Sequence, residues 1–490
     1  MKYRFGLGCL LVAATLATPA FAGGGYFSGH KGARAAGRGG AFTARADDVS
    51  AVTLNPAGLA LLDGTTLQAS NRFSYNAHFF TRAPTLDWGK AMGGVAPTVT
   101  FATVENQVPW QVLDPFIGGV TSFGLEDWAF ALAIFAPPGI GRQEFPVDGG
   151  QRYMMVSREA IILSYSASAA YRPSETFALG ATFSWIAVPK LDYQLVIDGM
   201  PSPATANPVS SYLDMLATVS GSDMFTPNAT IGAWFRPTPS LELGASAQVI
   251  PARIETQSTL KLEPLSSDLG SANVRLLRNN APADDVTLSL ALPLTARAGV
   301  RYRHLEGARE VFDVELDVVY ETWSRVDKFT LQTNGLVADV IGNRVDIGTI
   351  EVDKAWKDTV SVHLGSDYAL VPDTFTVRGG LFYESAVASP EYANVDFVSG
   401  RQLGGGLGFS LFTSGLEVAV AYEFRQQLTN RVAEADARVY QEVPASPCQA
   451  PYTDPNLCHA AYLGQPSPAV NAGTYDAYSH MATLEVLYRF

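Results

Sequence analysis

The stretch FDVELDVVYE (residues 312–321) alternates between apolar side chains and side chains that are mostly acidic. In a β-strand, successive side chains point to opposite faces, so the stretch predicts a strand with one apolar and one polar face. The same period of two recurs in residues 161–171, 177–185 and 482–490. These segments together predict an all-β protein.

The length of the alternating segments separates two all-β architectures. Strands of a soluble sandwich usually have about five or six residues. Several segments here keep their pattern for about ten or more residues, the length that a tilted strand needs to cross a bilayer. Their apolar faces carry aromatic residues near the strand ends, as an interfacial girdle would. A transmembrane β-barrel is therefore favoured over a soluble, secreted β protein.

The connections between the segments are alternately long and short. We predict fourteen strands, near 65–80, 111–123, 126–136, 156–172, 176–189, 225–236, 241–254, 287–304, 310–329, 356–370, 374–386, 401–412, 415–429 and 477–490. Short turns are predicted at 172–175, 236–240 and 371–373, and long loops at 190–224, 255–286 and 430–476. Outer-membrane barrels have short periplasmic turns and long outer loops. Residues 65–490 are thus predicted to form a fourteen-stranded antiparallel transmembrane β-barrel.

The N-terminus has the layout of a secretory signal peptide. Lys2 and Arg4 precede an apolar run over 7–16, and Ala20-Phe21-Ala22 provides a small-x-small cleavage site. Residues 1–22 are therefore predicted to be removed. The rest has 32 basic and 47 acidic residues, a net charge of −15. This excess of acid argues against a nucleic-acid partner. No run of about 18 apolar residues follows, so no transmembrane helix is expected.

Residues 23–64 lie between the signal peptide and the first predicted strand, and they are rich in glycine and alanine. The glycines from Gly32 to Gly39 lack the Lys-Ser/Thr step of a phosphate-binding loop. Small residues, tight turns and the rigid step at Asn55-Pro56 suit a compact plug inside a polar lumen. We predict that residues 23–64 form an N-terminal hatch.

The stretch GARAAGRGGAFTARADDVSAVTLNPAGLALL (residues 32–62) resembles the N-terminal hatch of the FadL/TodX family. These are outer-membrane transporters of long-chain fatty acids and other hydrophobic compounds. The resemblance continues in FDVELDVVYETWSRVDKF (312–329), WKDTVSVHLGSDYAL (356–370), TVRGGLFYE (376–384) and the last strand.

The resemblance implies passive transport without a cofactor, a metal or catalysis. In the family, an apolar groove between two outer loops captures the ligand. The ligand passes to a pocket near the hatch N-terminus and leaves sideways through a gap at a kinked third strand. The implied partners are a hydrophobic small molecule, outer-membrane lipid and the barrel assembly machinery, which would read the terminal Phe490. We expect a monomer.

The outer loop after the fifth predicted strand contains a candidate capture site. Tyr212, Met215, Leu216 and Val219 recur at helical spacing, which predicts a helix with one apolar face. Such a rim could receive an acyl chain, or the helix could pack only against its neighbours. A facing wall is predicted at 255–265, with Leu260, Leu262 and Leu265.

Two prolines and a glycine, Pro137, Pro138 and Gly139, follow the third predicted strand. Prolines lack the donor that a ladder needs, so this step could open the wall laterally or could merely end the strand at its rim.

The hatch offers two further sets of candidates. Asn55, Pro56 and Ala57 are expected to hold the hatch against the wall rather than to touch ligand. Tyr26 and Phe27 could line the inner pocket, as the resemblance implies, or could belong to a frayed terminus.

Charged residues share the parity expected to face the lumen: Arg297, Arg301, Arg303, Arg378, Asp313, Glu315 and Asp317. We expect them to pair across strands, although one arginine could instead meet a carboxylate head group. His363 has the same parity and is expected to hydrogen-bond its neighbours. Cys448 and Cys458 suit a disulfide in an exported loop, whereas a zinc site would need more ligands than His459 supplies.

A transporter of hydrophobic molecules, most plainly long-chain fatty acids, is the function that the sequence favours. The same fold could take up small aromatic hydrocarbons. A general porin would lack the plug, and an outer-membrane enzyme would need a Ser-His-acid set that the six scattered histidines do not suggest. An adhesin that uses the loop 430–476 is a further alternative.

Overall fold

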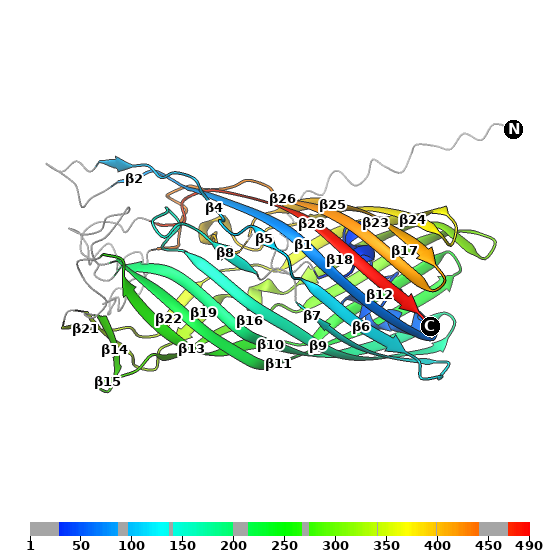
Figure 1. Ribbon diagram of the computed structural model, residues 1–490. Helices are drawn as coiled ribbons and strands as arrows, with labels where there is room; N and C mark the ends of the chain where they lie inside the picture. The colour runs from blue at the N-terminus through cyan, green and yellow to red at the C-terminus, as the bar shows by residue number, and fades with distance from the viewer. Residues whose placement is uncertain are drawn as a thin grey trace.

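The computed structural model describes residues 29–86, 97–136, 141–198, 214–266, 274–340, 342–397, 399–440 and 469–490. These residues form a closed antiparallel barrel, which encloses the short helices near the N-terminus (Figure 1). The helices are α1 (Ala33–Gly37), α2 (Ala51–Leu54), η1 (Pro56–Leu61), η4 (Trp323–Arg325) and η5 (Pro390–Tyr392). None of the helices in this part of the chain is long and apolar enough to span a membrane.

The described strands make up fourteen barrel strands, several of which are interrupted. In barrel order they are β1 (Thr65–Arg82); β4 (Val104–Glu105), β5 (Trp110–Gln111) and β6 (Pro115–Thr121); β7 (Trp128–Phe135) and β8 (Arg142–Glu144); β9 (Ser157–Ser174); β10 (Phe177–Asp198); β11 (Asp214–Thr238); β12 (Leu241–Ile250) and β13 (Arg253–Pro264); β16 (Asp285–Ala291) and β17 (Thr295–Glu306); β18 (Arg309–Glu321) and β19 (Lys328–Gln332); β22 (Ile350–Asp353) and β23 (Thr359–Val371); β24 (Phe375–Glu384); β25 (Gln402–Thr413); β26 (Leu416–Gln427) and β27 (Asn430–Val432); and β28 (Gly473–Arg489). The first strand pairs with the last from Thr66↔Arg489 to Arg82↔Gly473, which closes the barrel. The predicted fold class is confirmed.

Short turns join the strands at the end of the barrel that holds the C-terminus, on the right of Figure 1. The opposite end carries two small sheets. One pairs β2 (Thr85–Leu86) with β3 (Thr98–Val99), and the other contains β14 (Val274–Arg278), β15 (Ala281–Pro282), β20 (Val337–Val340) and β21 (Asn343–Asp346). Short turns mark the periplasmic end of such a barrel, so the small sheets lie at the outer end.

The middle of the barrel is apolar outside and polar inside. On β18, Leu316 is 42 % exposed, whereas its neighbour Asp317 is fully buried. β23 repeats the pattern with exposed Val362 and Leu364 beside buried His363. Exposed apolar side chains cover the wall here because lipid surrounds it, and the polar side chains face the interior.

The strands that line the outer end are longer than predicted. β10 extends to Asp198 and β11 begins at Asp214, so much of the predicted loop 190–224 is strand. β13 likewise occupies the first part of the predicted loop 255–286. We call the outer parts of β9, β10 and β11, together with β13, β16, β19 and β22, the outer extension.

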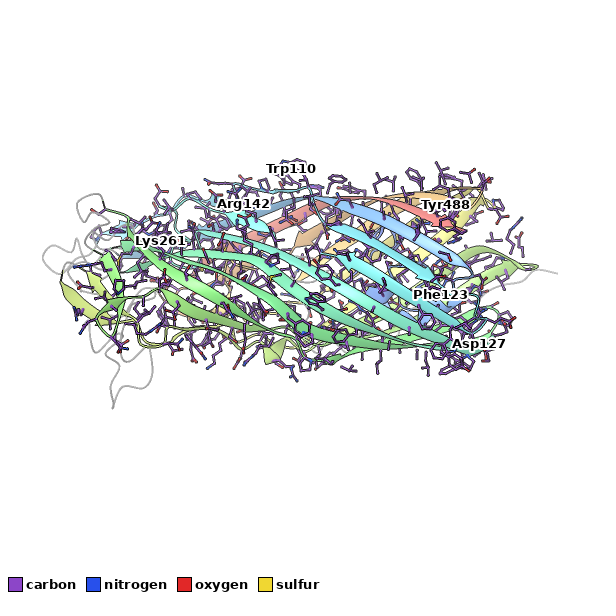
Figure 2. All side chains as sticks on the ribbon, turned by 60° about the horizontal axis from the view of Figure 1, so that its bottom comes forward. Trp110, Phe123, Asp127, Arg142, Lys261 and Tyr488 are labelled. Atoms are coloured by element: carbon purple, nitrogen blue, oxygen red, sulfur yellow. The ribbon has the colours of Figure 1, made fainter. Side chains whose placement is uncertain are left out.

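The outer extension reverses the polarity of the membrane-spanning part. On β13, Arg253, Glu255 and Lys261 are exposed, whereas Leu260 and Leu262 face inward and are buried. The same holds on β16, β19 and β22, whose inward side chains are Leu288, Leu290, Phe329, Leu331, Ile350 and Val352. Figure 2 shows Lys261 near the outer end, and Phe123 and Tyr488 near the periplasmic end. Because water surrounds β13, β16, β19 and β22, their exterior is polar and their apolar side chains turn inward, whereas the other face of β10 and β11 packs against a second apolar cluster that contains Val196.

Candidate functional site

The barrel encloses an internal segment, residues 29–64, which contains α1, α2 and η1. α1 contacts β24, β25, β26 and β28, and η1 contacts β7, β9, β10 and β11. Residues 30–43 and 48–52 are buried throughout. The internal segment therefore touches the wall on opposite sides of the lumen.

A network of charges ties the internal segment to β18 and β23. Arg38 is fully buried, and its guanidinium donates to Asp313 (2.9 Å), Glu315 (2.9 Å) and Asp367 (2.8 Å). Arg45 adds an ion pair with Asp313 at 3.0 Å. A buried carboxylate is costly unless it is paired and hydrogen-bonded, so each of these acids depends on the internal segment.

Backbone groups of the internal segment complete the same network. The N–H groups of Phe42 and Thr43 both donate to Asp317 Oδ2 at 2.9 Å. The Ala44 N–H donates to Glu315 Oε1 at 2.7 Å. Pairing among the wall residues was predicted, and Arg301 does pair with Asp313 while Arg378 pairs with Asp367. The part played by Arg38 and by the backbone of residues 42–44 was not predicted.

Asn55 and Pro56 lie against the inner face of β10 and β11. The Asn55 amide donates to Thr43 O (2.9 Å) and to Ala233 O (3.0 Å), and its oxygen accepts from the Ala57 N–H (3.2 Å). The asparagine thus links the internal segment to itself and to β11.

Inward-facing glycines let the internal segment approach the wall. A Cβ atom placed on Gly380 would lie 2.0 Å from Arg38 O, and one on Gly406 would lie 2.0 Å from Ala36 O. Further glycines meet residues 38–57 in the same way: Gly180, Gly232, Gly244, Gly299 and Gly365. Our sequence reasoning missed this belt. The sequence does contain a sign of it, because seven different strands each have a glycine at a position that faces the lumen.

The first residues of the internal segment lie beside an inner cavity. This cavity is lined by Gly29, Lys31, Phe135, Ile186, Leu292, Arg297 and Glu321, among others. Lys31 forms an ion pair with Asp114, next to β6. Burial lowers the pKa of Lys31 to about 8, although Asp114 opposes the shift. Tyr26 and Phe27, which were predicted to line a pocket here, lie outside the described residues.

A second cavity, the outer apolar cavity, fills the outer extension. Its lining is almost wholly apolar and consists of Ile162, Val188, Leu191, Tyr193, Leu195, Ile197, Ala217, Val219, Ile254, Leu260, Leu262, Leu288, Leu290, Phe329, Leu331, Ile347, Ile350, Val352, Phe397 and Arg158. Seven strands contribute, so the cavity has a rigid wall made of paired strands.

The predicted capture helix is wrong, because residues 214–238 form β11. Val219 lines the outer apolar cavity, and it pairs with Leu260 of β13, so the two lie side by side rather than face to face. Met215 belongs to the apolar cluster around the cavity, whereas Leu216 packs on the other face of β11. Residues four apart lie on the same face of a helix and also on the same face of a strand. Met215 and Val219 therefore share a face in the observed strand, as they would in the predicted helix. Tyr212 lies outside the described residues.

Among the described residues, the ladder is interrupted between the second and third barrel strands. The last pair of β6 and β7 is Phe116↔Phe135, followed by one bond from Ala136 N–H to Pro115 O at 3.2 Å. Beyond it β5 pairs with β1 and β8 pairs with β9, and the described residues of the two strands meet again where Gln107 N–H donates to Glu144 O at 2.8 Å. We call this interruption the wall gap. Pro137, Pro138 and Gly139, predicted to open the wall, lie outside the described residues.

A third cavity, the wall cavity, lies inside the wall gap. Gln111 and Arg142 flank the gap, and both line the cavity. Gln111 lies against Gly141, since a Cβ atom added there would be 2.3 Å from Gln111 Cδ. Figure 2 shows Trp110 and Arg142 on the outside of the barrel, about halfway along its length.

Several remaining candidates have a clear position. His363 Nδ1 is 2.7 Å from Gly39 O, and Nε2 is 3.0 Å from Ser361 Oγ, so this wall histidine is hydrogen-bonded as expected. Phe490 is exposed at the periplasmic end, where its N–H donates to Thr65 O at 2.9 Å. Cys448 and Cys458 lie outside the described residues.

A comparison with protein-family models identifies the family of this chain. The model described as outer membrane protein transport protein (OMPP1/FadL/TodX) matches residues 13–451. The chain therefore belongs to the OMPP1/FadL/TodX family. It is a transport barrel of the outer membrane of a Gram-negative bacterium, as predicted, and the family is one of transport proteins for hydrophobic compounds rather than of enzymes. No relative matches among the curated proteins.

Solved structures share the fold at low sequence identity. A FadL homologue from Pseudomonas aeruginosa is 16 % identical, with 96 % of this chain and 100 % of that chain covered and a TM-score of 0.71. The toluene transporter TodX from P. putida is 15 % identical, with 94 % and 99 % covered and a TM-score of 0.62. CymD, a monoaromatic hydrocarbon channel, is 15 % identical, with 95 % and 99 % covered and a TM-score of 0.58.

Proposed function

We propose that the protein takes up long-chain fatty acids, that it captures them in the outer apolar cavity, and that it releases them sideways through the wall gap. The reversed polarity of the outer extension carries this proposal. Strands that stand in water have their apolar side chains turned inward around a cavity, and such a cavity favours an acyl chain over water.

The internal segment directs the ligand away from the axis of the barrel. Residues 29–64 fill the lumen below the outer apolar cavity and are held by the buried network around Arg38. In this proposal they act as a hatch. A straight passage would require the network to break, and each unpaired buried charge would cost several kcal/mol, about 3–5.

The wall gap offers the alternative exit. The described backbone groups beside it do not pair across the two strands, and the exposed apolar side chains of Trp110, Val112 and Leu113 lie next to it on the lipid side. A hydrophobic molecule that leaves here enters the bilayer without crossing water. In this proposal the inner cavity beside Gly29 and Arg297 is an intermediate binding site for the ligand.

A reversible cross-link across the wall gap tests the route. We would combine Gln111→Cys with Gly141→Cys in a background that carries Cys448→Ser and Cys458→Ser. A Cβ atom at position 141 would lie 2.3 Å from Gln111 Cδ, so we expect the two introduced thiols to form a disulfide. Uptake of labelled oleate is measured in cells that lack their own transporter, before and after reduction.

We expect the oxidised variant to lose most of its oleate uptake and the reduced variant to regain it. Each single cysteine variant serves as a control and should transport under both conditions. Uptake that is equal in the oxidised and reduced double variant would overturn the lateral exit. Wild-type uptake of toluene without oleate would change the substrate to small aromatic hydrocarbons.

A further inference from the structure

The wall cavity differs in chemistry from the outer apolar cavity. Its described lining includes the buried arginines Arg72, Arg158 and Arg425, the exposed Arg142, which pairs with Glu144, and a single carboxylate, Asp114. Amide and hydroxyl side chains make up most of the remaining lining. A cavity of this kind offers a hydrophobic tail little but offers an anionic head group many donors.

Two residues line both cavities, Arg158 of β9 and Phe397. The Arg158 guanidinium carbon lies 4.6 Å from the centroid of the Phe397 ring, and Nη2 donates to Gln143 Oε1 at 3.1 Å. Among the described residues that line the outer apolar cavity, Arg158 alone carries a charge. Arg158 therefore lies at the boundary between the outer apolar cavity and the wall cavity, which is lined by cationic side chains.

Buried donors also face the wall cavity. Gln402 is 1 % exposed, and its Nε2 has no acceptor within the described part of the chain. Arg425 Nε likewise has none there, although Arg425 Nη1 donates to Glu384 at 3.2 Å. Buried donors usually have an acceptor, and a carboxylate that entered this cavity would supply two oxygens.

We propose that the wall cavity is a head-group site for the carboxylate of a single-chain amphiphile, whose tail occupies the outer apolar cavity, and that Arg158 determines the preference for carboxylates over neutral chains. This inference rests on the proposed function. It extends it by assigning the anionic head to one cavity and the tail to another, with the boundary at Arg158.

The test compares two ligands of equal chain length, laurate and 1-dodecanol, bound to purified protein in lipid nanodiscs. A hydrogen bond to a charged group contributes about 1.5–3 kcal/mol, so the wild type should bind laurate about tenfold or more tightly than dodecanol. Arg158→Met should remove that preference and leave dodecanol binding within about twofold.

Matched variants separate charge from packing. Arg158→Lys keeps the charge and should retain part of the preference. Gln402→Leu should weaken laurate binding by a smaller factor and leave dodecanol unchanged. Arg253→Met removes an exposed arginine from the outer face of β13 and should affect neither ligand.

The outcomes distinguish the two proposals. Equal loss of laurate and dodecanol in Arg158→Met, with the folded barrel retained, would show that Arg158 only packs against Phe397 and would overturn the head-group site. Equal binding of both ligands by the wild type would also overturn it while leaving the transport proposal intact. Binding of neither ligand by the wild type would overturn the transport proposal itself.

Discussion

The membrane-spanning part of the barrel and the outer extension belong to the same barrel strands, yet they place side chains of opposite polarity on their inner faces. In β12, Leu243 and Ala245 face outward and Glu242 faces inward. In β13, a few residues further along the same barrel strand, Lys261 faces outward and Leu260 inward. The parity of the inward positions does not change between β12 and β13, whereas their polarity does.

The surroundings of the two regions explain the reversal. Lipid around the membrane-spanning part requires an apolar exterior, and the polar side chains then need partners inside. Those partners are supplied by the internal segment, which fills the lumen. Around the outer extension, water requires a polar exterior, and the inward apolar side chains pack against loop residues such as Phe397 and line a cavity. One region therefore closes the barrel, and the other leaves an apolar cavity.

The largest effect is expected where the internal segment approaches the wall most closely. Gly380→Leu would place a side chain into the position of Arg38 O, which a Cβ atom alone would approach to 2.0 Å. Backbone cannot yield as a flexible side chain can, so the internal segment should be displaced. We expect a steady ion current through the variant in planar bilayers, at a voltage where the wild type is closed.

Gly379→Leu is the matched control. Gly379 faces the lipid, and its nearest neighbour would be Leu407 Cδ2 at an ordinary 3.4 Å. This variant should remain closed. A current of equal size in both variants would show that the current reports a general weakening of β24 and not a displaced segment.

The second effect tests the charge network that distinguishes the membrane-spanning part. Arg38→Met leaves Asp313, Glu315 and Asp367 without their shared partner inside a buried site. Removing one member of a buried ion pair typically costs about 3–5 kcal/mol. We expect urea titration of the purified protein to show a loss of this size in the free energy of unfolding.

The exposed pair Arg309–Asp373 provides the comparison. Arg309→Met should cost less than about 1 kcal/mol, because solvent screens the pair. A loss in Arg38→Met no greater than that in Arg309→Met would contradict the view that the network holds the internal segment.

A smaller effect is expected from making the inner face of the outer extension polar. Leu260→Gln places an amide in the outer apolar cavity, and burying such a group without a partner costs about 1–3 kcal/mol. Oleate binding should weaken by about tenfold to a hundredfold. Lys261→Gln changes the next residue, which faces outward, and should leave binding unchanged. Equal weakening by both variants would show that the cavity is not the capture site.

The sequence allowed the number of strands and their order to be predicted, because the period of two and the short turns are local signals. It did not allow the length of β11 to be predicted. Residues 214–224 contain both Met215 and Val219 on one face, and a spacing of four fits a helix turn as well as two steps of a strand. The outer extension was not predicted, because we expected each strand to end where its apolar outward face ends. The strands continue beyond that point with a polar outward face.

The site was predictable only in part. The motif Asn55-Pro56-Ala57 has a recognisable pattern, and Asn55 hydrogen-bonds the wall at Ala233, while the role of the motif stays a prediction. The belt that contains Gly380 and Gly406 depends on which strands surround the internal segment at one level. Arg158 is a single arginine at the start of a strand, and only the meeting of two cavities distinguishes it from other charged residues.

The smallest effect is expected on the outer face of the outer extension. Arg253 and Lys261 are exposed and pair with acids two residues away on the same strand, Glu255 and Glu263. Replacing both cations with leucine should change the free energy of unfolding by less than about 1 kcal/mol and leave oleate uptake unchanged, because exposed pairs contribute little. A few exposed apolar side chains cost little free energy in water, whereas an unpaired amide in the apolar cavity on the other face costs more. If the double leucine variant lost uptake as strongly as Leu260→Gln, the outer face of β13 would have to bind ligand too, and the contrast between the two faces would fail.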